Sequence, residues 1–311
     1  MNDVNEVILD IDQGPALRLI EITGPRPGPC VALIGGVHGD EDEGVLSVRR
    51  VASLLRDRPI SGRLRALAMS NPSACAAYTR CTPEDGQNLA RVFPGKPDGS
   101  LTERTAHAIT ARVLTGADAL IDLHSAGRDF AMPLFCGYHA DDNDLGRRCE
   151  ALARAFGAPL TWAHLTVSHG RSLSAARDLG IPAIYAEASG GSEVRGAESD
   201  AFVGGVLNVL RLLGLVDEPV PPTRSKLIRD PGGNTDAGVL APVSGTWVTR
   251  TTAGGMVGEG DLLAEIYGED GVKRAEVTAP RAGIVMMLRR LSRVSEGTSV
   301  AMVAAPPEAW E

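Results

Sequence analysis

Short apolar runs alternate with amphipathic stretches between residues 30 and 215. The run CVALI at 30–34 predicts a buried strand, and apolar residues at helical spacing predict an amphipathic helix over 44–55 that ends before Pro59. Strands that alternate with helices in this way are typical of a mostly parallel sheet with helices on its faces. The pattern therefore predicts an α/β fold with a mostly parallel or mixed sheet flanked by helices.

The rest of this region continues the alternation. The pattern predicts strands over 64–69, 119–124 and 183–187, and helices over 102–114, 144–156, 172–179 and 201–213. Residues 71–100 hold too many Pro, Gly and Asn residues for regular structure. Irregular segments of this length in a compact domain are usually functional or disordered, so we expect a long loop here.

The pattern changes after the proline-rich stretch VDEPVPP at 216–222, which neither a helix nor a central strand tolerates. We place a domain boundary there, with a larger domain over 1–218 and a smaller C-terminal domain over 219–311. The smaller part reads as short strands separated by turn residues. Strands without intervening helices predict a small all-β domain.

The C-terminal part also repeats itself. APVSG at 241–245 recurs as APRAG at 279–283, and VGEG at 257–260 recurs as VSEG at 294–297, which predicts a β-sandwich built by internal duplication. Two such half-units resemble the biotinyl/lipoyl-type barrel-sandwich domain, which carries its cofactor on a lysine in the hairpin between the halves. The nearest candidate here, Lys273, lacks the flanking methionine or aspartate of a modified site. We therefore interpret it as a solvated turn residue.

Composition and charge narrow the class of partner. The chain of 311 residues has 31 basic and 39 acidic residues and a formal net charge of −8, which favours a small-molecule substrate over nucleic acid. Its five cysteines include no C-x-x-C pair, so they fit neither a disulfide framework nor a structural zinc site. No apolar run approaches the roughly 20 residues that cross a bilayer, and the acidic N-terminus does not match a secretory signal. We expect a soluble, cytoplasmic protein, and the sequence leaves open whether it forms a homo-oligomer.

Polar side chains follow three of the predicted strands, at the strand ends where ligands bind in open α/β sheets. His38 and Glu41 follow the first strand in GGVHGDEDEG at 35–44, His124 ends the second in DLH, and Glu187 ends the third in YAE. Two histidines and one carboxylate, with a fourth position open to water, form the ligand set of a catalytic zinc. The sequence therefore predicts a zinc ion held by His38, Glu41 and His124.

Other polar residues have simpler interpretations. Asp40, Asp42 and Glu43 could replace Glu41 as a ligand, but negative charge at the start of a helix is favourable in itself. The remaining four histidines do not follow predicted strands, and we interpret them as surface or capping residues rather than ligands. They are His107, His139, His164 and His169.

Four motifs in this order resemble the succinylglutamate desuccinylase/aspartoacylase family, a branch of the zinc carboxypeptidase-like hydrolases. They are GGVHGDEDEG at 35–44, NLARVFPG at 88–95, DLH at 122–124 and AEA at 186–188. The resemblance spans about residues 30 to 215, and members of the family commonly carry a C-terminal β domain. It implies that residues 1–218 form a zinc hydrolase domain with one Zn²⁺ per chain.

The resemblance also implies roles for single residues. His38, Glu41 and His124 match the zinc ligands, and Glu187 matches the general base that activates the attacking water. Arg80, in the stretch YTR, matches the arginine that polarises the scissile carbonyl.

The substrate-binding motif departs from the family pattern. The usual Asp-Leu-Asn-Arg appears here as Asn88-Leu-Ala-Arg91. Arg91 matches the arginine that grips the substrate carboxylate, and Asn88 is predicted to bind substrate with it. Ala90 replaces an asparagine that helps to hold the carboxylate, so an acyl amino compound other than N-acetylaspartate or succinylglutamate is favoured. Arg91 alone can still form a bidentate pair with a carboxylate, and the alternative for it is a structural salt bridge.

Together these residues predict a zinc-dependent deacylase that cleaves the amide bond of a small N-acyl amino acid or related amide. Zinc lowers the pKa of bound water from about 15.7 toward 7, Glu187 takes the proton and passes it to the leaving amine, and Arg80 helps to stabilise the oxyanion. Two alternatives stay open. One is a zinc carboxypeptidase that acts on peptides, and the other is a non-catalytic binding or carrier protein whose functional part is the C-terminal domain.

Overall fold

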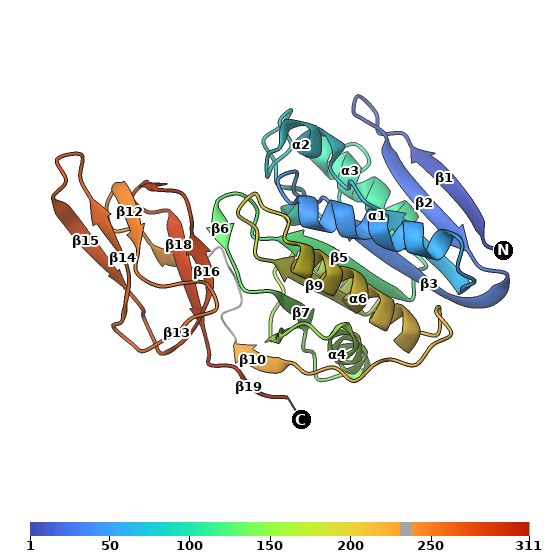
Figure 1. Ribbon diagram of the computed structural model, residues 1–311. Helices are drawn as coiled ribbons and strands as arrows, with labels where there is room; N and C mark the ends of the chain where they lie inside the picture. Colours follow the sequence, from blue (N-terminus) through green and yellow to red (C-terminus); the bar gives the residue numbers. More distant parts are fainter. Residues whose placement is uncertain (231–237, 311) are drawn as a thin grey trace.

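The computed structural model describes residues 1–230 and 238–310. Figure 1 shows a large part in which helices flank a sheet and, beside it, a smaller part made of strands. The fold class predicted from the sequence is therefore confirmed. Within the described residues, no helix is both long and apolar enough to cross a membrane.

A ten-stranded sheet forms the centre of the large part, in the order β1-β2-β4-β3-β5-β9-β7-β8-β10-β19. Its strands are β1 (Asp3–Leu9), β2 (Leu17–Thr23), β3 (Arg26–Gly35), β4 (Ser61–Leu67), β5 (Ala119–Ser125), β7 (Phe135–His139), β8 (Leu160–His164), β9 (Ala183–Ala188), β10 (Lys226–Asp230) and β19 (Glu308–Ala309). Strands β4, β3, β5 and β9 pair in parallel, whereas β7 is antiparallel to β9 and parallel to β8. The sheet is mixed, and the carboxyl ends of β3, β5 and β9 lie at the same edge.

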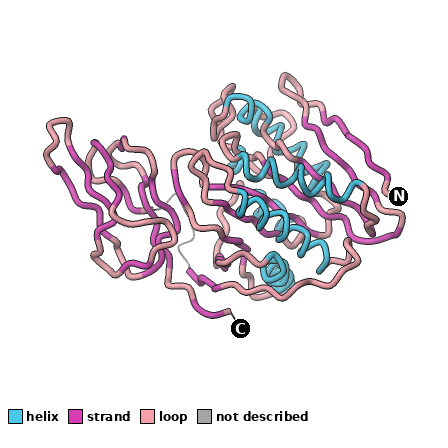
Figure 2. The backbone as a smooth tube through the Cα atoms, in the orientation of Figure 1, coloured by secondary structure: helices cyan, strands magenta, loops and turns pink. Residues whose placement is uncertain are grey.

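Helices cover both faces of this sheet, as Figure 2 shows. They are α1 (Asp42–Arg56), α2 (Pro72–Ala77), α3 (Leu101–Ile109), α4 (Asp144–Phe156), α5 (Ser172–Asp178) and α6 (Gly196–Leu212), with a 3₁₀ turn η1 (Leu89–Arg91) and a π-helical turn η2 (Thr110–Leu114). Helices α1, α4 and α6 contribute their apolar sides to the core on one face, and α3 and α5 contribute to the core on the other. Both faces of the central strands are thus buried, which explains their nearly continuous apolar sequences.

The helices and strands predicted between residues 30 and 215 are present, although α6 starts earlier than expected, at Gly196. The prediction missed four strands of the sheet, β1, β2, β7 and β8. It also described 71–100 as irregular throughout, whereas α2 and η1 lie within it. Strand β7 was missed because Gly137 and His139 interrupt its apolar run. All five of its residues are buried by neighbouring strands, which its own sequence pattern does not indicate.

Two histidines correct the sequence interpretation. His139 and His164 end β7 and β8 and are buried, with exposed fractions of 7% and 5%, so their interpretation as surface or capping residues is wrong. His164 Nε2 lies 2.7 Å from the hydroxyl of Tyr185, whose ring lies over Gly137. Strands β7 and β8 run opposite to β3, β5 and β9. His139 and His164 therefore lie at the other edge of the sheet from His38, Glu41 and His124.

The C-terminal part contains two antiparallel sheets, with the orders β11-β18-β16-β13 and β15-β14-β12-β17. The strands are β11 (Val239–Leu240), β12 (Gly245–Thr249), β13 (Met256–Val257), β14 (Leu262–Tyr267), β15 (Lys273–Thr278), β16 (Gly283–Arg289), β17 (Arg293–Val294) and β18 (Ser299–Ala304). Trp247, Leu263 and Val285 are among the buried side chains of its core. Lys273 begins β15, and its ammonium pairs with Glu265 and Glu276.

The two parts of the chain are joined by shared strands and a shared core. Strand β6 (Phe130–Ala131), from the large part, pairs with β16, while β10 and β19 belong to the large sheet although they lie beyond residue 218. Apolar side chains of β7, β8 and β10 pack against Met286 and Met302. The boundary between residues 218 and 219 stays a prediction.

Two adjacent glycines in α6 allow a test of how α6 packs against α4. A Cβ on Gly205 would lie 2.8 Å from ring atoms of Phe156, whereas a Cβ on Gly204 would meet nothing within 4 Å. We expect Gly204→Ala to raise the free energy of unfolding by up to about 1 kcal/mol, because alanine favours the helix. Gly205→Ala should lower it by about 1–3 kcal/mol through overpacking. Urea unfolding followed by circular dichroism measures both variants, and equal effects would contradict the α4–α6 packing.

Candidate metal centre and active site

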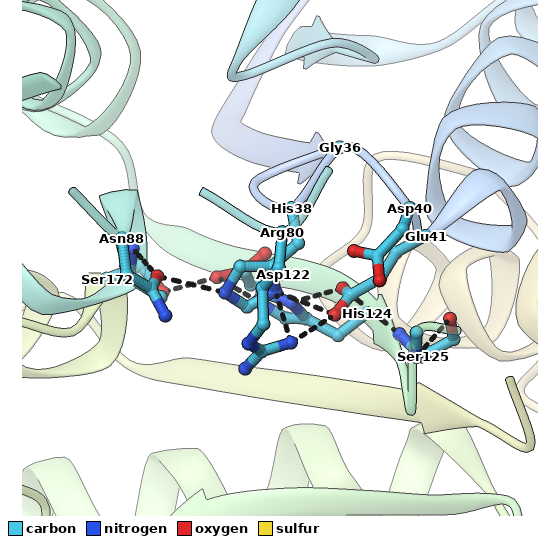
Figure 3. A network of polar contacts seen from close by, with 12 residues as sticks. Gly36, His38, Asp40, Glu41, Arg80, Asn88, Asp122, His124, Ser125 and Ser172 are labelled. Atoms are coloured by element: carbon cyan, nitrogen blue, oxygen red, sulfur yellow. Dashed lines mark hydrogen bonds and ion pairs between the residues drawn. The ribbon is translucent and has the colours of Figure 1, made fainter. Parts of the chain in front are cut away.

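Three polar side chains converge at the edge of the sheet where β3 and β5 end (Figure 3). His38 and Glu41 lie between β3 and α1, and His124 lies near the end of β5. Glu41 Oε1 lies 2.7 Å from His38 Nδ1, and Glu41 Oε2 lies 2.9 Å from His124 Nδ1. Within residues 1–230 and 238–310, these three residues form the single group of three or more His, Cys, Asp or Glu side chains that could hold a metal ion.

The register of the sheet and two glycines bring this loop to His124. Gly35 at the end of β3 pairs with Leu123 on β5, so the loop that follows β3 emerges beside the next residue of β5. Gly36 has a φ of 60°, a left-handed conformation that favours glycine. A Cβ on Gly44 would lie 2.3 Å from the carbonyl oxygen of Leu123, so only glycine lets α1 start this close to β5.

The second nitrogen of each histidine ring also has a partner. His38 Nε2 lies 3.0 Å from Asn88 Oδ1, and His124 Nε2 lies 3.1 Å from Asp122 Oδ2, which also accepts the hydroxyl of Ser172. Metal-binding histidines usually donate their other ring N–H to such an oxygen. Both Nδ1 atoms then face Glu41, so these residues fit a metal ion.

Burial and neighbouring charges shift the protonation of the three groups. Burial lowers the pKa of His124, but the carboxylates of Asp122 and Glu41 outweigh burial and hold it well above its usual value. Burial and the Arg80 guanidinium lower the pKa of His38. Burial raises the pKa of Glu41, but the two histidines outweigh this effect and leave it well below its usual value. The centre therefore combines a carboxylate with a protonated His124.

Glu187 lies beside this centre. It is the register partner of His124 on the adjacent strand β9. Its Oε2 atom is inaccessible to solvent and has no hydrogen-bond partner among the described residues. Burial therefore raises the pKa of Glu187 well above its usual value, and the positive charges of His124 and Arg80 only partly oppose that shift. A half-buried carboxyl group with an enclosed oxygen and a raised pKa, next to side chains that could hold a metal ion, is typical of an acid–base residue.

Arg80 reaches the centre from the segment after α2. Its Nη1 lies 3.1 Å from Glu41 Oε1 and 3.3 Å from His38 Nδ1, and 46% of its side chain is exposed. Arg91 lies further along, at the end of η1, where its Nη1 donates to the carbonyl oxygen of Ala90 at 3.1 Å. The structure thus joins Arg80 directly to the metal-binding group, and connects Arg91 to it through η1 and Asn88.

The structure also distinguishes Glu41 from its neighbours and adds a residue that the sequence did not single out. Asp42 and Glu43 lie in the first turn of α1, and Asp40 Oδ2 accepts the backbone N–H of Arg128 at 3.0 Å.

Ser172 is the residue that the sequence did not single out. Its hydroxyl donates to Asp122, and it begins α5. A serine at the start of a helix is too common to indicate a site.

The model of the succinylglutamate desuccinylase/aspartoacylase catalytic domain matches residues 27–213. The chain belongs to this family. Members of the family are deacylases that act on N-acyl amino acids. The resemblance seen in the four motifs is therefore confirmed.

Individual relatives support the same assignment over the whole chain. The N-alpha-acetyl-L-2,4-diaminobutyric acid deacetylase of Halomonas elongata is 33% identical over 298 residues, which are 94% of this chain and 86% of that protein. A family member from Rhodobacter sphaeroides has a TM-score of 0.87 at 28% identity and covers 100% of this chain and 96% of its own. The product-bound ectoine utilization protein of Ruegeria pomeroyi has a TM-score of 0.88 at 28% identity, with coverages of 98% and 95%.

The raised pKa of His124 leads to a prediction about metal binding. The raised pKa of His124 favours a proton on the metal-free histidine that a metal ligand must lose, so Zn²⁺ binding should release at least one proton per ion. Isothermal titration calorimetry in two buffers with different ionisation enthalpies measures this release. Identical heats in both buffers would contradict it, and the control variant His124→Ala should show little binding heat.

Proposed function

We propose that the chain is a zinc-dependent deacylase that hydrolyses the amide bond of a small N-acetylated amino acid. The observation that carries this proposal is the convergence of His38, Glu41 and His124 beside Glu187. Two imidazoles and one carboxylate leave a coordination position open, as in catalytic zinc sites. When bound, zinc supplies Lewis-acid polarisation of a carbonyl group and lowers the pKa of water from about 15.7 toward 7.

Glu187 moves the proton in this proposal. Its carboxylate accepts a proton from the attacking water and then donates it to the nitrogen of the leaving amine. The amide C–N bond breaks, the oxygen of the water stays on the acyl carbon as acetate, and the amino acid leaves with a free amine. The raised pKa of Glu187 supports the second of these steps, because it favours the acid form that donates to the amine.

The two arginines bind and orient the substrate. Arg80 carries a half-exposed guanidinium beside Glu41, so it can donate to the carbonyl oxygen as negative charge develops there. Arg91 would bind the substrate carboxylate, since a guanidinium fork matches carboxylate geometry. Ala90, which precedes it, offers no side-chain hydrogen bond.

We propose N-α-acetyl-2,4-diaminobutyrate as the first substrate to test. The support is the relative from Halomonas elongata, whose similarity extends through both parts of the chain. Ala90 stands where the family usually has an asparagine that helps to hold the substrate carboxylate. The loss of this hydrogen-bonding group favours a substrate other than N-acetylaspartate or succinylglutamate.

A substrate panel tests this function. Zinc-loaded protein is assayed for amine release from N-α-acetyl-2,4-diaminobutyrate, N-acetylaspartate, N-succinylglutamate and an unblocked dipeptide. We expect the first compound to have the highest kcat/KM. Cleavage of the dipeptide alone would favour the carboxypeptidase alternative, and no cleavage of any compound would contradict the deacylase.

The carrier alternative predicts a covalent group on Lys273. The ammonium of Lys273 lies 3.2 Å from Glu265 and also pairs with Glu276, so it is engaged on the surface of its own domain. This supports the deacylase over a swinging arm. Intact mass spectrometry of the purified protein would show a mass increase if the carrier alternative held.

Glu187→Ala tests the proton transfer. Removal of a general base typically costs a factor of about 10²–10⁴ in rate, while the three metal-binding side chains stay in place. We therefore expect near-stoichiometric zinc and a kcat lower by about that factor. The matched control is Glu193→Ala, which removes an exposed carboxylate on the loop after β9 that pairs with Arg195. Unchanged turnover of Glu187→Ala would remove Glu187 from this role.

Arg91→Ala tests carboxylate binding. Charge-assisted hydrogen bonds contribute about 1.5–3 kcal/mol, so KM for a carboxylate-bearing substrate should rise about 10- to 100-fold with a smaller change in kcat. The control is Arg147→Ala, an exposed arginine in α4 that lies 3.7 Å from Asp144. If KM stays the same for every carboxylate-bearing substrate, the structural salt bridge is the better interpretation of Arg91.

A further inference from the structure

Tyr185 and Glu187 are the two residues of β9 that are half-buried, while the other four residues of the strand are buried. Successive side chains of a strand alternate between faces, so Tyr185 and Glu187 point to the same face of the sheet. Tyr185 pairs in register with Asp122 on β5 and with Gly137 on β7, one step further from the edge at which the site lies. A large aromatic side chain therefore starts beside the proposed acid–base residue, and the mechanism above does not use it.

Three contacts hold the ring of Tyr185 in one position. A Cβ on Gly137 would lie 2.1 Å from ring atom Cε1, so glycine at this position leaves room for the ring to extend across β7. The hydroxyl lies 2.7 Å from Nε2 of His164. The ring of Phe135 packs edge-on against the ring of Tyr185, with 5.7 Å between the centroids. The ring cannot swing aside without the loss of a hydrogen bond to a buried group.

The hydrogen bond between Tyr185 and His164 does not depend on pH near neutrality. Burial lowers the pKa of His164 to about 3, and the charges of Arg171 and His139 act in the same direction. Burial raises the pKa of the Tyr185 hydroxyl well above its usual value, and the charge of Glu187 adds to this effect. Both groups therefore stay neutral under assay conditions, and the ring keeps its place.

The residues around Tyr185 indicate which half of the substrate it faces. In the proposed mechanism Glu187 protonates the leaving amine, so the amino-acid half begins beside Glu187. Arg91, which is proposed to bind the carboxylate of that half, lies against Gly170, because a Cβ there would be 2.2 Å from the carbonyl oxygen of Arg91. The next residue, Arg171, is close enough for its charge to act on Tyr185. The side chain of the amino acid would therefore extend toward the ring of Tyr185.

We propose that Tyr185 is a specificity-determining residue of the deacylase, whose fixed ring limits the length of the side chain on the leaving amino acid. The two methylene groups and terminal ammonium of 2,4-diaminobutyrate form a short side chain of the kind this limit allows. Its longer homologues ornithine and lysine would meet the ring. The inference rests on the proposed function, because it assigns the amino-acid half of the substrate to the space between Glu187 and Tyr185.

The test compares the N-α-acetyl derivatives of 2,4-diaminobutyrate, ornithine and lysine, which carry the same terminal group on side chains of increasing length. One methylene group in a fitted pocket changes kcat/KM by about 10- to 200-fold, so zinc-loaded wild type should lose at least about 10-fold from the first compound to the last. Tyr185→Leu and Tyr185→Ala should reduce this preference by about 10-fold or more, because they shorten the barrier. Tyr185→Phe should keep the preference, because the ring remains.

Tyr138→Leu is the matched control. Tyr138 follows Gly137 on β7 and points to the opposite face of the sheet, where its ring stacks on Trp310. This variant removes a buried aromatic ring without a change beside Glu187, so the side-chain preference should stay as in wild type. A ratio of kcat/KM values for two substrates does not depend on the amount of folded protein. Melting curves identify any variant that does not fold, and Tyr185→Leu retains an apolar side chain if Tyr185→Ala is too unstable.

Two results would overturn the inference directly. One is an unchanged side-chain preference in folded Tyr185→Leu, and the other is a wild type that cleaves the lysine derivative as well as the diaminobutyrate derivative. A Tyr185 variant that gains activity on N-α-succinyl-2,4-diaminobutyrate, with its side-chain preference unchanged, would place Tyr185 beside the acyl group and also contradict the inference. Failure of the proposed function would look different, because wild type would then cleave none of these compounds.

Discussion

The parallel pairing of β3, β5 and β9 is the constraint on which the site depends. It sets Gly35 beside Leu123 and His124 beside Glu187, so that the loop with His38 and Glu41 emerges at the same edge of the sheet as His124 and Glu187. Successive side chains of a strand point to opposite faces of the sheet. A slip of one residue in the register would therefore point His124 or Glu187 to the opposite face, into the apolar core there. Helices on both faces of the sheet make such a slip costly, because it would bury the polar residues among apolar ones.

The same burial strengthens the electrostatic interactions among the side chains of the site. His38, Glu41 and His124 are at most 8% exposed, and in this environment each group depends on the charges of the others. A buried charge without a partner is strongly unfavourable, and the carboxylate of Glu41 has both histidines as partners. Glu187 Oε2 is enclosed and has no hydrogen-bond partner among the described residues, and burial favours the protonated form of this carboxyl group.

Much of this arrangement could be predicted from the sequence. The clear periodicity of 44–55 and the apolar runs at 30–34 and 119–124 identified the central elements, and the polar residues after them identified side chains that converge and could hold a metal ion. Strands β7 and β8 were missed, because the neighbours that bury them are distant in sequence. The contacts of His38 with Asn88 and of Asp122 with Ser172 each join residues 50 positions apart, so no local pattern indicates them. The likeness of the four motifs to the desuccinylase/aspartoacylase family predicted roles for Arg80, Arg91 and Glu187, but it did not predict these contacts.

The most direct test of this account is a crystal structure of the zinc-loaded protein with anomalous diffraction at the zinc absorption edge. The account predicts one peak per chain, about 2.0–2.2 Å from His38 Nδ1, His124 Nδ1 and a carboxylate oxygen of Glu41. An ion bound elsewhere, with these three side chains still hydrogen-bonded to one another, would contradict it.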